Sequence, residues 1–201
     1  MYALTSHFMD DLHRRLQAIV GETAVPLETR AFYVRTLETR TGNWIADLMR
    51  AAVGADCCLM IAGAIRGTTP LPPGPLRLED VVGLHPDGDG VVKIRVSGSV
   101  LLDALENGVR YWPGPAGRFP CVSGIRFSFD GTKPELERVD RTSVEVGGQV
   151  LDLDRKYTLA TKQYVADGND GYVCFRGSET LIDEEHAAPV QQILRNHLRC
   201  M

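Results

Sequence analysis

The sequence has no surplus of basic residues and no long apolar run. It carries 22 Lys and Arg against 26 Asp and Glu, a formal net charge of −4 over 201 residues. A protein that coats nucleic acid needs excess positive charge to neutralise phosphates, so we do not expect that class. No apolar segment is long enough to span a membrane, and the opening residues, MYALTSHFMDDLHRRL, lack the pattern of a signal peptide. We therefore expect a soluble chain without a targeting signal.

Cysteine is sparse and carries no motif. The five cysteines are odd in number and none are in C-x-x-C spacing, which argues against a disulfide framework and against a zinc site. Buried free thiols, typical of a reducing compartment, are the expectation. The positions are Cys57, Cys58, Cys121, Cys174 and Cys200.

Catalytic motifs are absent as well. The sequence has no G-x-S-x-G elbow, no phosphate-binding G-x-x-x-x-G-K-[ST] loop, no G-x-G-x-x-G, and no histidine pair at i, i+4. The loop DGNDG at 167–171 suggests calcium by composition, but Gly171, Tyr172 and Ser178 stand where an EF-hand needs an oxygen ligand, Gly and Glu. We predict a chain with no metal site and no catalytic residues of its own.

The hydrophobic patterns predict an α+β (mixed α/β) fold, a mixed sheet covered by helices. Strands and helices interleave without a strict repeat, and the later strands cluster. Residues 1–30 read as a leading or linker helix with its connector, and 31–201 as one domain. Helices are expected at 10–20, at 41–54 with Thr41 as cap, at 77–84, at 99–109 and from Pro189 on; strands are expected at 31–37, 57–65, 91–98, 121–130, 138–146 and 156–164.

Isolated polar residues at the ends of these elements are the candidates for binding. Arg35 follows a predicted strand, Arg66 follows the buried run CCLMIAGAI, and Asp170 lies in the 167–171 loop. A loop arginine is usually a solvated surface charge. Arg66 is the strongest exception, because a guanidinium just past a buried strand suits a bidentate grip on a phosphate or carboxylate.

Laid end to end, these pieces resemble the C-terminal domain of 5′-nucleotidases over roughly residues 20–175. The similarity is carried by E-T-x-x-G-N at 38–43, G-x-I-R at 63–66, G-R-F-P-x-V-S-G-I at 117–125 and G-x-D-G-Y at 168–172. In that family an N-terminal metallophosphoesterase domain holds two divalent metal ions, and the C-terminal domain grips the nucleotide. The resemblance implies that this chain corresponds to the substrate-binding half, without the metal-binding one, and we expect it not to hydrolyse AMP alone.

The resemblance also implies roles for four residues. Arg35 and Arg66 match arginines that contact the phosphate, Tyr164 stands where one base-stacking ring is expected, and Asp170 matches the Asp that hydrogen-bonds the ribose hydroxyls. No cofactor is implied for this chain.

Two further positions depart from the family pattern. Ile61 stands where an Asn is usual, and Asp87 replaces the second stacking ring. Asp87 and Asp89 would repel an anionic ligand if they face the pocket. Trp112 could supply a replacement ring from its loop, although packing against the core is the expectation for that residue.

Two functions follow as alternatives. The first is the substrate-recognition domain of a 5′-nucleotidase-like phosphoesterase in nucleotide catabolism, which binds a nucleoside or nucleotide and pairs with a metallophosphoesterase domain. The second is an interaction or scaffold domain that kept the fold and lost the ligand. Arg35, Arg66, Tyr164 and Asp170 favour the first, which we place ahead. The cysteines and the opening residues favour the cytoplasm, whereas many relatives are periplasmic or extracellular.

Overall fold

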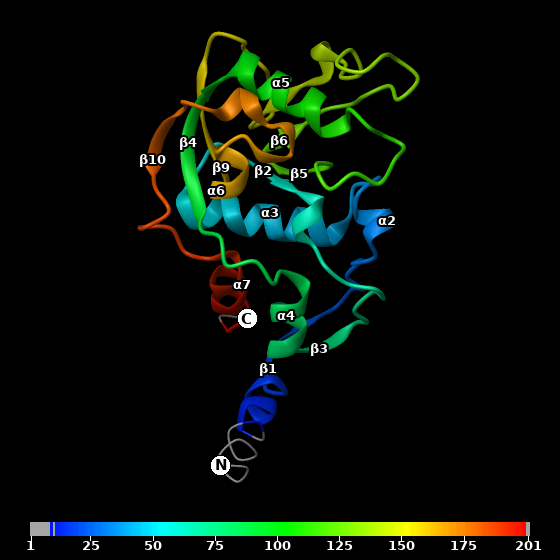
Figure 1. The fold of residues 1–201 in the computed structure, drawn as a ribbon, viewed down its shortest axis with the longest axis vertical. Helices are drawn as coiled ribbons and strands as arrows, with labels where there is room; N and C mark the ends of the chain where they lie inside the picture. Colours follow the sequence, from blue (N-terminus) through cyan, green and yellow to red (C-terminus); the bar gives the residue numbers. More distant parts are fainter. Residues whose placement is uncertain (1–8, 10, 200–201) are drawn as a thin grey trace.

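A mixed five-stranded sheet forms the centre of the protein, in a computed structural model that describes residue 9 and residues 11–199 (Figure 1). Its strand order is β10-β4-β9-β2-β5, in which β2 and β9 run parallel and the other neighbours are antiparallel. The expected α+β class with a mixed sheet is confirmed. The strands are β2 (Cys57–Ile61), β4 (Val91–Ser97), β5 (Pro120–Ser123), β9 (Lys156–Lys162) and β10 (Glu179–Ile182).

The long helices α3 (Arg40–Val53) and α5 (Gly98–Val109) cover opposite faces of this sheet. A Cβ on Gly42 of α3 would lie 2.7 Å from Cys121 Sγ, and one on Gly108 of α5 would lie 2.9 Å from Pro120 Cδ. Neighbouring residues of a strand point to opposite faces, so the two helices contact β5 from opposite sides. All five residues of β2 are buried as a result.

Local sequence explains where α3 starts and stops. The Thr39 side chain accepts a hydrogen bond from Gly42 N, and Gly54 ends the helix in the left-handed conformation at φ 59°. Thr39, not Thr41, is therefore the cap. The end of the helix at Gly54 agrees with the prediction.

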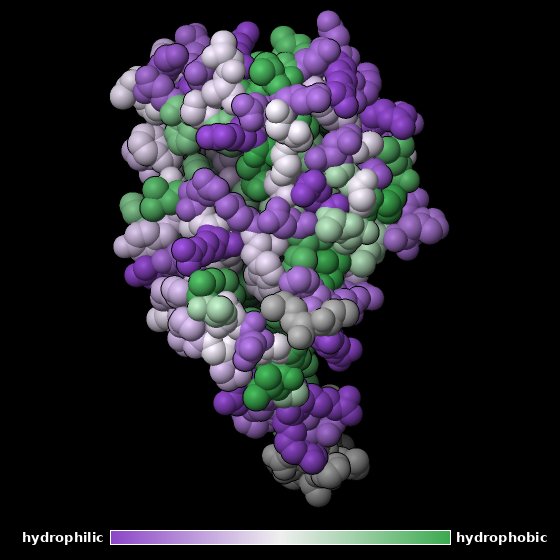
Figure 2. Space-filling model, turned by 180° about the vertical axis from the view of Figure 1, so that it is seen from behind, coloured by the Kyte–Doolittle hydropathy of each residue, from purple (hydrophilic) through white to green (hydrophobic). Residues whose placement is uncertain are grey.

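Smaller elements surround this centre. β1 (Ile19–Thr23) pairs with β3 (Gly74–Arg77), and these strands gather with α4 (Leu78–Leu84) and α7 (Val190–Arg199) at the narrow lower end of Figure 1. Figure 2 shows apolar side chains on the opposite face as separate patches among polar ones. The remaining elements are α2 (Ala31–Val34), β6 (Ile125–Arg126), β7 (Glu145–Val146), β8 (Gln149–Val150) and α6 (Gln163–Ala166) with the 3₁₀ turns η1 (Ala62–Ala64), η2 (Arg141–Ser143), η3 (Asn169–Gly171) and η4 (Val173–Phe175).

Two predictions near the start of the chain were wrong. Residues 31–37 were expected as a strand, but Ala31–Val34 form the short helix α2, whose Phe32 and Tyr33 are exposed and pair with no strand. The helix expected at 10–20 covers 11–16 among the described residues, and Ile19–Thr23 form β1 instead. Asp10 lies outside the described residues. The division of the chain at residue 30 stays a prediction.

The late strands are shorter than predicted. Gly124, at φ 69°, interrupts the expected strand at 121–130, and most of 138–146 is irregular, with β7 only at its end. Strand β9 ends at Lys162, so Tyr164 lies on helix α6 rather than on a strand. Strand β10 was not predicted.

The cysteine prediction is confirmed for three positions. Cys57, Cys58 and Cys121 are buried and free, Cys174 is half-buried and free, and Cys200 lies outside the described residues. Burial raises the pKa of Cys57 and Cys121 to about 12, so these thiols are not nucleophiles at neutral pH. Within residues 11–199, no helix is long and apolar enough to cross a bilayer.

Candidate ligand-binding pocket

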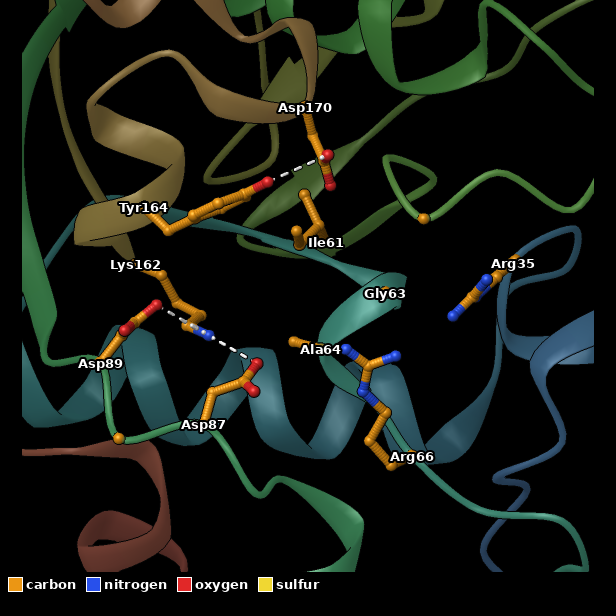
Figure 3. A pocket seen from close by; sticks show the side chains of 12 residues that line it. Arg35, Ile61, Gly63, Ala64, Arg66, Asp87, Asp89, Lys162, Tyr164 and Asp170 are labelled. Atoms are coloured by element: carbon orange, nitrogen blue, oxygen red, sulfur yellow. Dashed lines mark hydrogen bonds and ion pairs between the residues drawn. The ribbon is translucent and has the colours of Figure 1, made fainter.

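A pocket of about 560 Å³ opens where β2, α2, α6 and the loop before β4 meet (Figure 3). Arg35, Arg66, Tyr164 and Asp170, the four residues singled out from the sequence, all line it. Arg35, Arg66 and the segment that carries both Tyr164 and Asp170 lie far apart in the sequence, and the fold brings them together. Arg35 and Arg66 lie at one side of the pocket in Figure 3, and Tyr164 lies at the other.

The two arginines lack partners in the described part of the chain. Arg35 follows helix α2 directly, and its Nε is buried with no hydrogen-bond acceptor. Arg66 is exposed, and only its backbone is anchored, by a 2.9 Å hydrogen bond from its N–H to the Leu84 carbonyl. A buried guanidinium N–H without an acceptor is costly, typically about 1–3 kcal/mol. Both guanidinium groups line the pocket, which places two positive charges beside each other there.

Tyr164 and Asp170 contact each other across their loop. The Tyr164 hydroxyl donates to Asp170 Oδ1 at 3.3 Å, and Asn169 Nδ2 donates to the Tyr164 carbonyl at 2.9 Å. Partial burial and the neighbouring carboxylate raise the pKa of Tyr164, so its hydroxyl stays protonated at neutral pH. Tyr164 is 41% exposed and lines the pocket, so its side chain is accessible to a ligand there.

Asp170 adopts a backbone conformation that few residues tolerate. Its φ of 51° and ψ of 27° lie in the left-handed region. Asn107 of α5 donates to the Asp170 carbonyl at 3.1 Å, and Arg118 donates to the Asn107 side-chain oxygen at 2.7 Å. This brace holds the Asp170 backbone in its left-handed conformation at the pocket wall.

Lys162 forms the centre of a second charged group in the pocket. Its ammonium contacts Asp87 Oδ2 and Asp89 Oδ2, each at 3.1 Å. The Lys162 side chain is only 3% exposed, whereas those of Asp87 and Asp89 are 38% and 37% exposed. We call Lys162, Asp87 and Asp89 the lysine–aspartate clamp.

The two positions that depart from the family pattern also belong to this pocket. Ile61 and Asp87 both line the pocket, and so does Asp89. The repulsion expected from these acids is reduced by Lys162, whose charge balances one of the two. Trp112 lines a different pocket and donates from Nε1 to the Thr36 carbonyl at 3.0 Å, so it supplies no second ring here.

Sequence reasoning missed Lys162 and the glycine contact beside it. Lys162 ends a strand of mainly buried residues, and a lysine at a buried position of such a strand was the available signal. Gly63 donates from its N–H to the Gly117 carbonyl at 2.8 Å, and a Cβ on Gly63 would lie 3.0 Å from Gly117 Cα. No local sequence signal shows that these two glycines meet.

His85 lies fully buried at the end of α4. Both ring nitrogens lack a hydrogen-bond partner within the described residues. Burial and the nearby Lys162 lower the pKa of His85 to about 4, although Asp87 acts in the opposite direction. The imidazole is therefore neutral at pH 7.

Acidification should destabilise the protein through His85. Its pKa falls from the usual 6.5 to about 4 on folding, so the unfolded chain binds the proton first as pH drops between these values. We expect the unfolding free energy to decrease by up to about 1.4 kcal/mol per pH unit from pH 6.5 toward 4, about 3 kcal/mol in all. Urea unfolding across this range measures it. In His85→Leu the unfolding free energy should depend less on pH, whereas the exposed substitution His13→Gln should leave the dependence unchanged. The same pH dependence in the unsubstituted protein and both variants would contradict the role of His85.

Metal-ligating groups do not gather in this pocket or elsewhere within the described residues. No three His, Cys, Asp or Glu side chains there are placed to hold a metal ion. The pocket residues bring together two guanidinium groups, an aromatic ring and several carboxylates.

Comparison with known proteins agrees with this description. Residues 19–177 match the family model described as 5′-nucleotidase, C-terminal domain. The trifunctional nucleotide phosphoesterase protein YfkN of Bacillus subtilis is 33% identical over 175 residues, which cover 84% of this chain and 12% of that protein. Protein UshA of Escherichia coli is 28% identical, over 86% of this chain and 30% of its own length.

A solved structure has the same fold. The 5′-nucleotidase precursor of Thermus thermophilus superposes with a TM-score of 0.87 and 30% identity, over 97% of this chain and 39% of that one. The chain thus spans well under half the length of the proteins that it matches.

Proposed function

Because the chain belongs to the family of 5′-nucleotidase C-terminal domains, we propose that it binds a nucleoside or nucleotide in the pocket lined by Arg35, Arg66, Tyr164 and Asp170. Its role is substrate recognition for a 5′-nucleotidase-like phosphoesterase. Water activation belongs to a metallophosphoesterase domain with two divalent metal ions, with which this domain pairs.

The position of Arg35 and Arg66 at one side of the same pocket carries this proposal. A phosphate between Arg35 and Arg66 would accept hydrogen bonds from both guanidinium groups, in the bidentate geometry that arginine favours. Both guanidinium groups lie at the same side of the pocket, so one phosphate could bridge them.

The nucleoside would extend from the arginines toward Tyr164. Its base would stack on the exposed face of that ring, which contributes about 1–3 kcal/mol in comparable sites. Asp170, between the two ends of the pocket, would accept hydrogen bonds from the ribose hydroxyls. The Asn107 brace supports this role, because it holds the Asp170 backbone in place before the ligand arrives.

Asp170→Asn tests the ribose contact. We expect the protein to bind adenosine about 10-fold or more tightly than 2′,3′-dideoxyadenosine, because hydrogen bonds to a charged group contribute about 1.5–3 kcal/mol. In Asp170→Asn this preference should fall below about 3-fold in calorimetric titrations. Exposed Asp167 lies in the same loop outside the pocket, and Asp167→Asn should keep the preference.

The scaffold alternative is supported by one observation, the two acids that stand opposite the single ring. A panel of nucleosides and nucleotides that produces neither heat nor a thermal shift would favour that alternative. If adenosine and 2′,3′-dideoxyadenosine bind with equal affinity, only the role of Asp170 is contradicted, and nucleoside binding stands.

A further inference from the structure

The lysine–aspartate clamp forms the pocket wall across from Tyr164 (Figure 3). A base stacked on the Tyr164 ring would lie in the space between that ring and this wall. The wall is polar, and its charge is set by two carboxylates and one ammonium group. Contacts there depend on hydrogen bonding and charge, not on a second stacking ring.

Acceptor atoms outnumber donors in the clamp. Each carboxylate places one oxygen, Oδ2, on Lys162 Nζ, and the other oxygen of each has no hydrogen-bond partner in the described chain. Lys162 is buried, and its ammonium group is paired with both carboxylates. The clamp therefore has a net charge of −1, and its two partly exposed carboxylates face the pocket.

We propose that the clamp selects nucleotides whose base carries an exocyclic amino group, adenine and cytosine, over the oxo bases hypoxanthine and uracil, an inference that rests on the proposed nucleotide binding. The amino group of adenine or cytosine donates to a carboxylate oxygen, as Asp and Glu accept from the cytosine amino group in nucleic-acid recognition. A carbonyl oxygen at the same place meets another acceptor with like partial charge. It loses its water and gains no donor.

The third N–H of Lys162 defines the competing outcome, which is a preference for the oxo bases. If that N–H reached the ligand, it would donate to the carbonyl of uracil or hypoxanthine. The burial of Lys162 and its two contacts at 3.1 Å favour the carboxylates as the groups that meet the base.

Two matched ligand pairs test the inference. AMP and IMP differ at position 6 of the purine, and CMP and UMP differ at position 4 of the pyrimidine, while ribose and phosphate are the same within each pair. By calorimetric competition we expect AMP to bind about 10-fold or more tightly than IMP, and CMP likewise over UMP.

Asp87→Asn should bring both ratios to within about 2-fold, because an amide offers a donor as well as an acceptor. Asp89 still pairs with Lys162 in this variant, so the fold is retained. Asp103→Asn, an exposed substitution on α5 outside the pocket, should leave both ratios unchanged.

The outcomes separate this inference from the proposed function. Ratios near one in the unsubstituted protein, or a preference for IMP and UMP, would overturn the selectivity while nucleotide binding stands. Ratios unaffected by Asp87→Asn would overturn the role of that carboxylate. If none of the four nucleotides binds, the proposed function fails, and the inference fails with it.

Discussion

Replacing Arg66 by alanine is expected to weaken AMP binding about 10- to 100-fold and to leave adenosine binding unchanged. A charge-assisted hydrogen bond contributes about 1.5–3 kcal/mol, and only AMP carries the phosphate that would accept it. The Arg66 side chain is exposed and its backbone N–H still bonds to Leu84 in the variant, so the fold is undisturbed. Calorimetric titration with both ligands measures the difference.

Arg126→Ala is the matched control, because Arg126 is exposed and does not line this pocket. It should change neither affinity. Unchanged AMP affinity in Arg66→Ala would contradict a phosphate site at the arginines. An equal loss for AMP and adenosine would show that Arg66 acts on the nucleoside instead.

Replacing Asp87 and Asp89 together by alanine is expected to lower the unfolding free energy by about 3–5 kcal/mol. The double substitution leaves the Lys162 ammonium, 3% exposed, without a counter-charge, and an uncompensated buried charge costs about that much. Either single substitution leaves one carboxylate at 3.1 Å and should cost much less. Urea unfolding of the three variants gives the comparison.

Adding Lys162→Met to the double variant should restore most of the lost stability, because the unpaired charge is then gone. The three substitutions are coupled through one buried group, so their effects should be strongly non-additive. A double variant whose loss equals the sum of two small single losses, with no recovery on adding Lys162→Met, would contradict the clamp.

The elements with a strong local pattern could be predicted from sequence. The apolar run at 57–65 was predicted as one buried strand; its first five residues form the buried β2, and the 3₁₀ turn η1 follows. Helix α5 buries the side that its periodicity indicated. Segments with a weak pattern could not. Residues 31–37 look like a strand by composition, but Ala31–Val34 form the short helix α2, and Arg35, which follows it, lines the pocket.

The pocket residues could also be predicted from the sequence only in part. Family resemblance identified four residues that do line one cavity, because their positions depend on motifs that the sequence retains. Their nucleotide contacts stay predictions. The contacts of Lys162 with Asp87 and Asp89, and of Asn107 with Asp170, join residues more than 60 positions apart, and such pairings depend on tertiary structure that no local pattern encodes.

Titration of the ¹⁵N-labelled chain with AMP, followed by backbone amide shifts, tests nucleotide binding in this pocket most directly. We expect saturable shifts confined to amides that line the pocket, notably Gly63, Arg66, Gly117 and Asp170. Saturation without movement of these amides, or no saturation with AMP at any concentration that the protein tolerates, would contradict the proposed site.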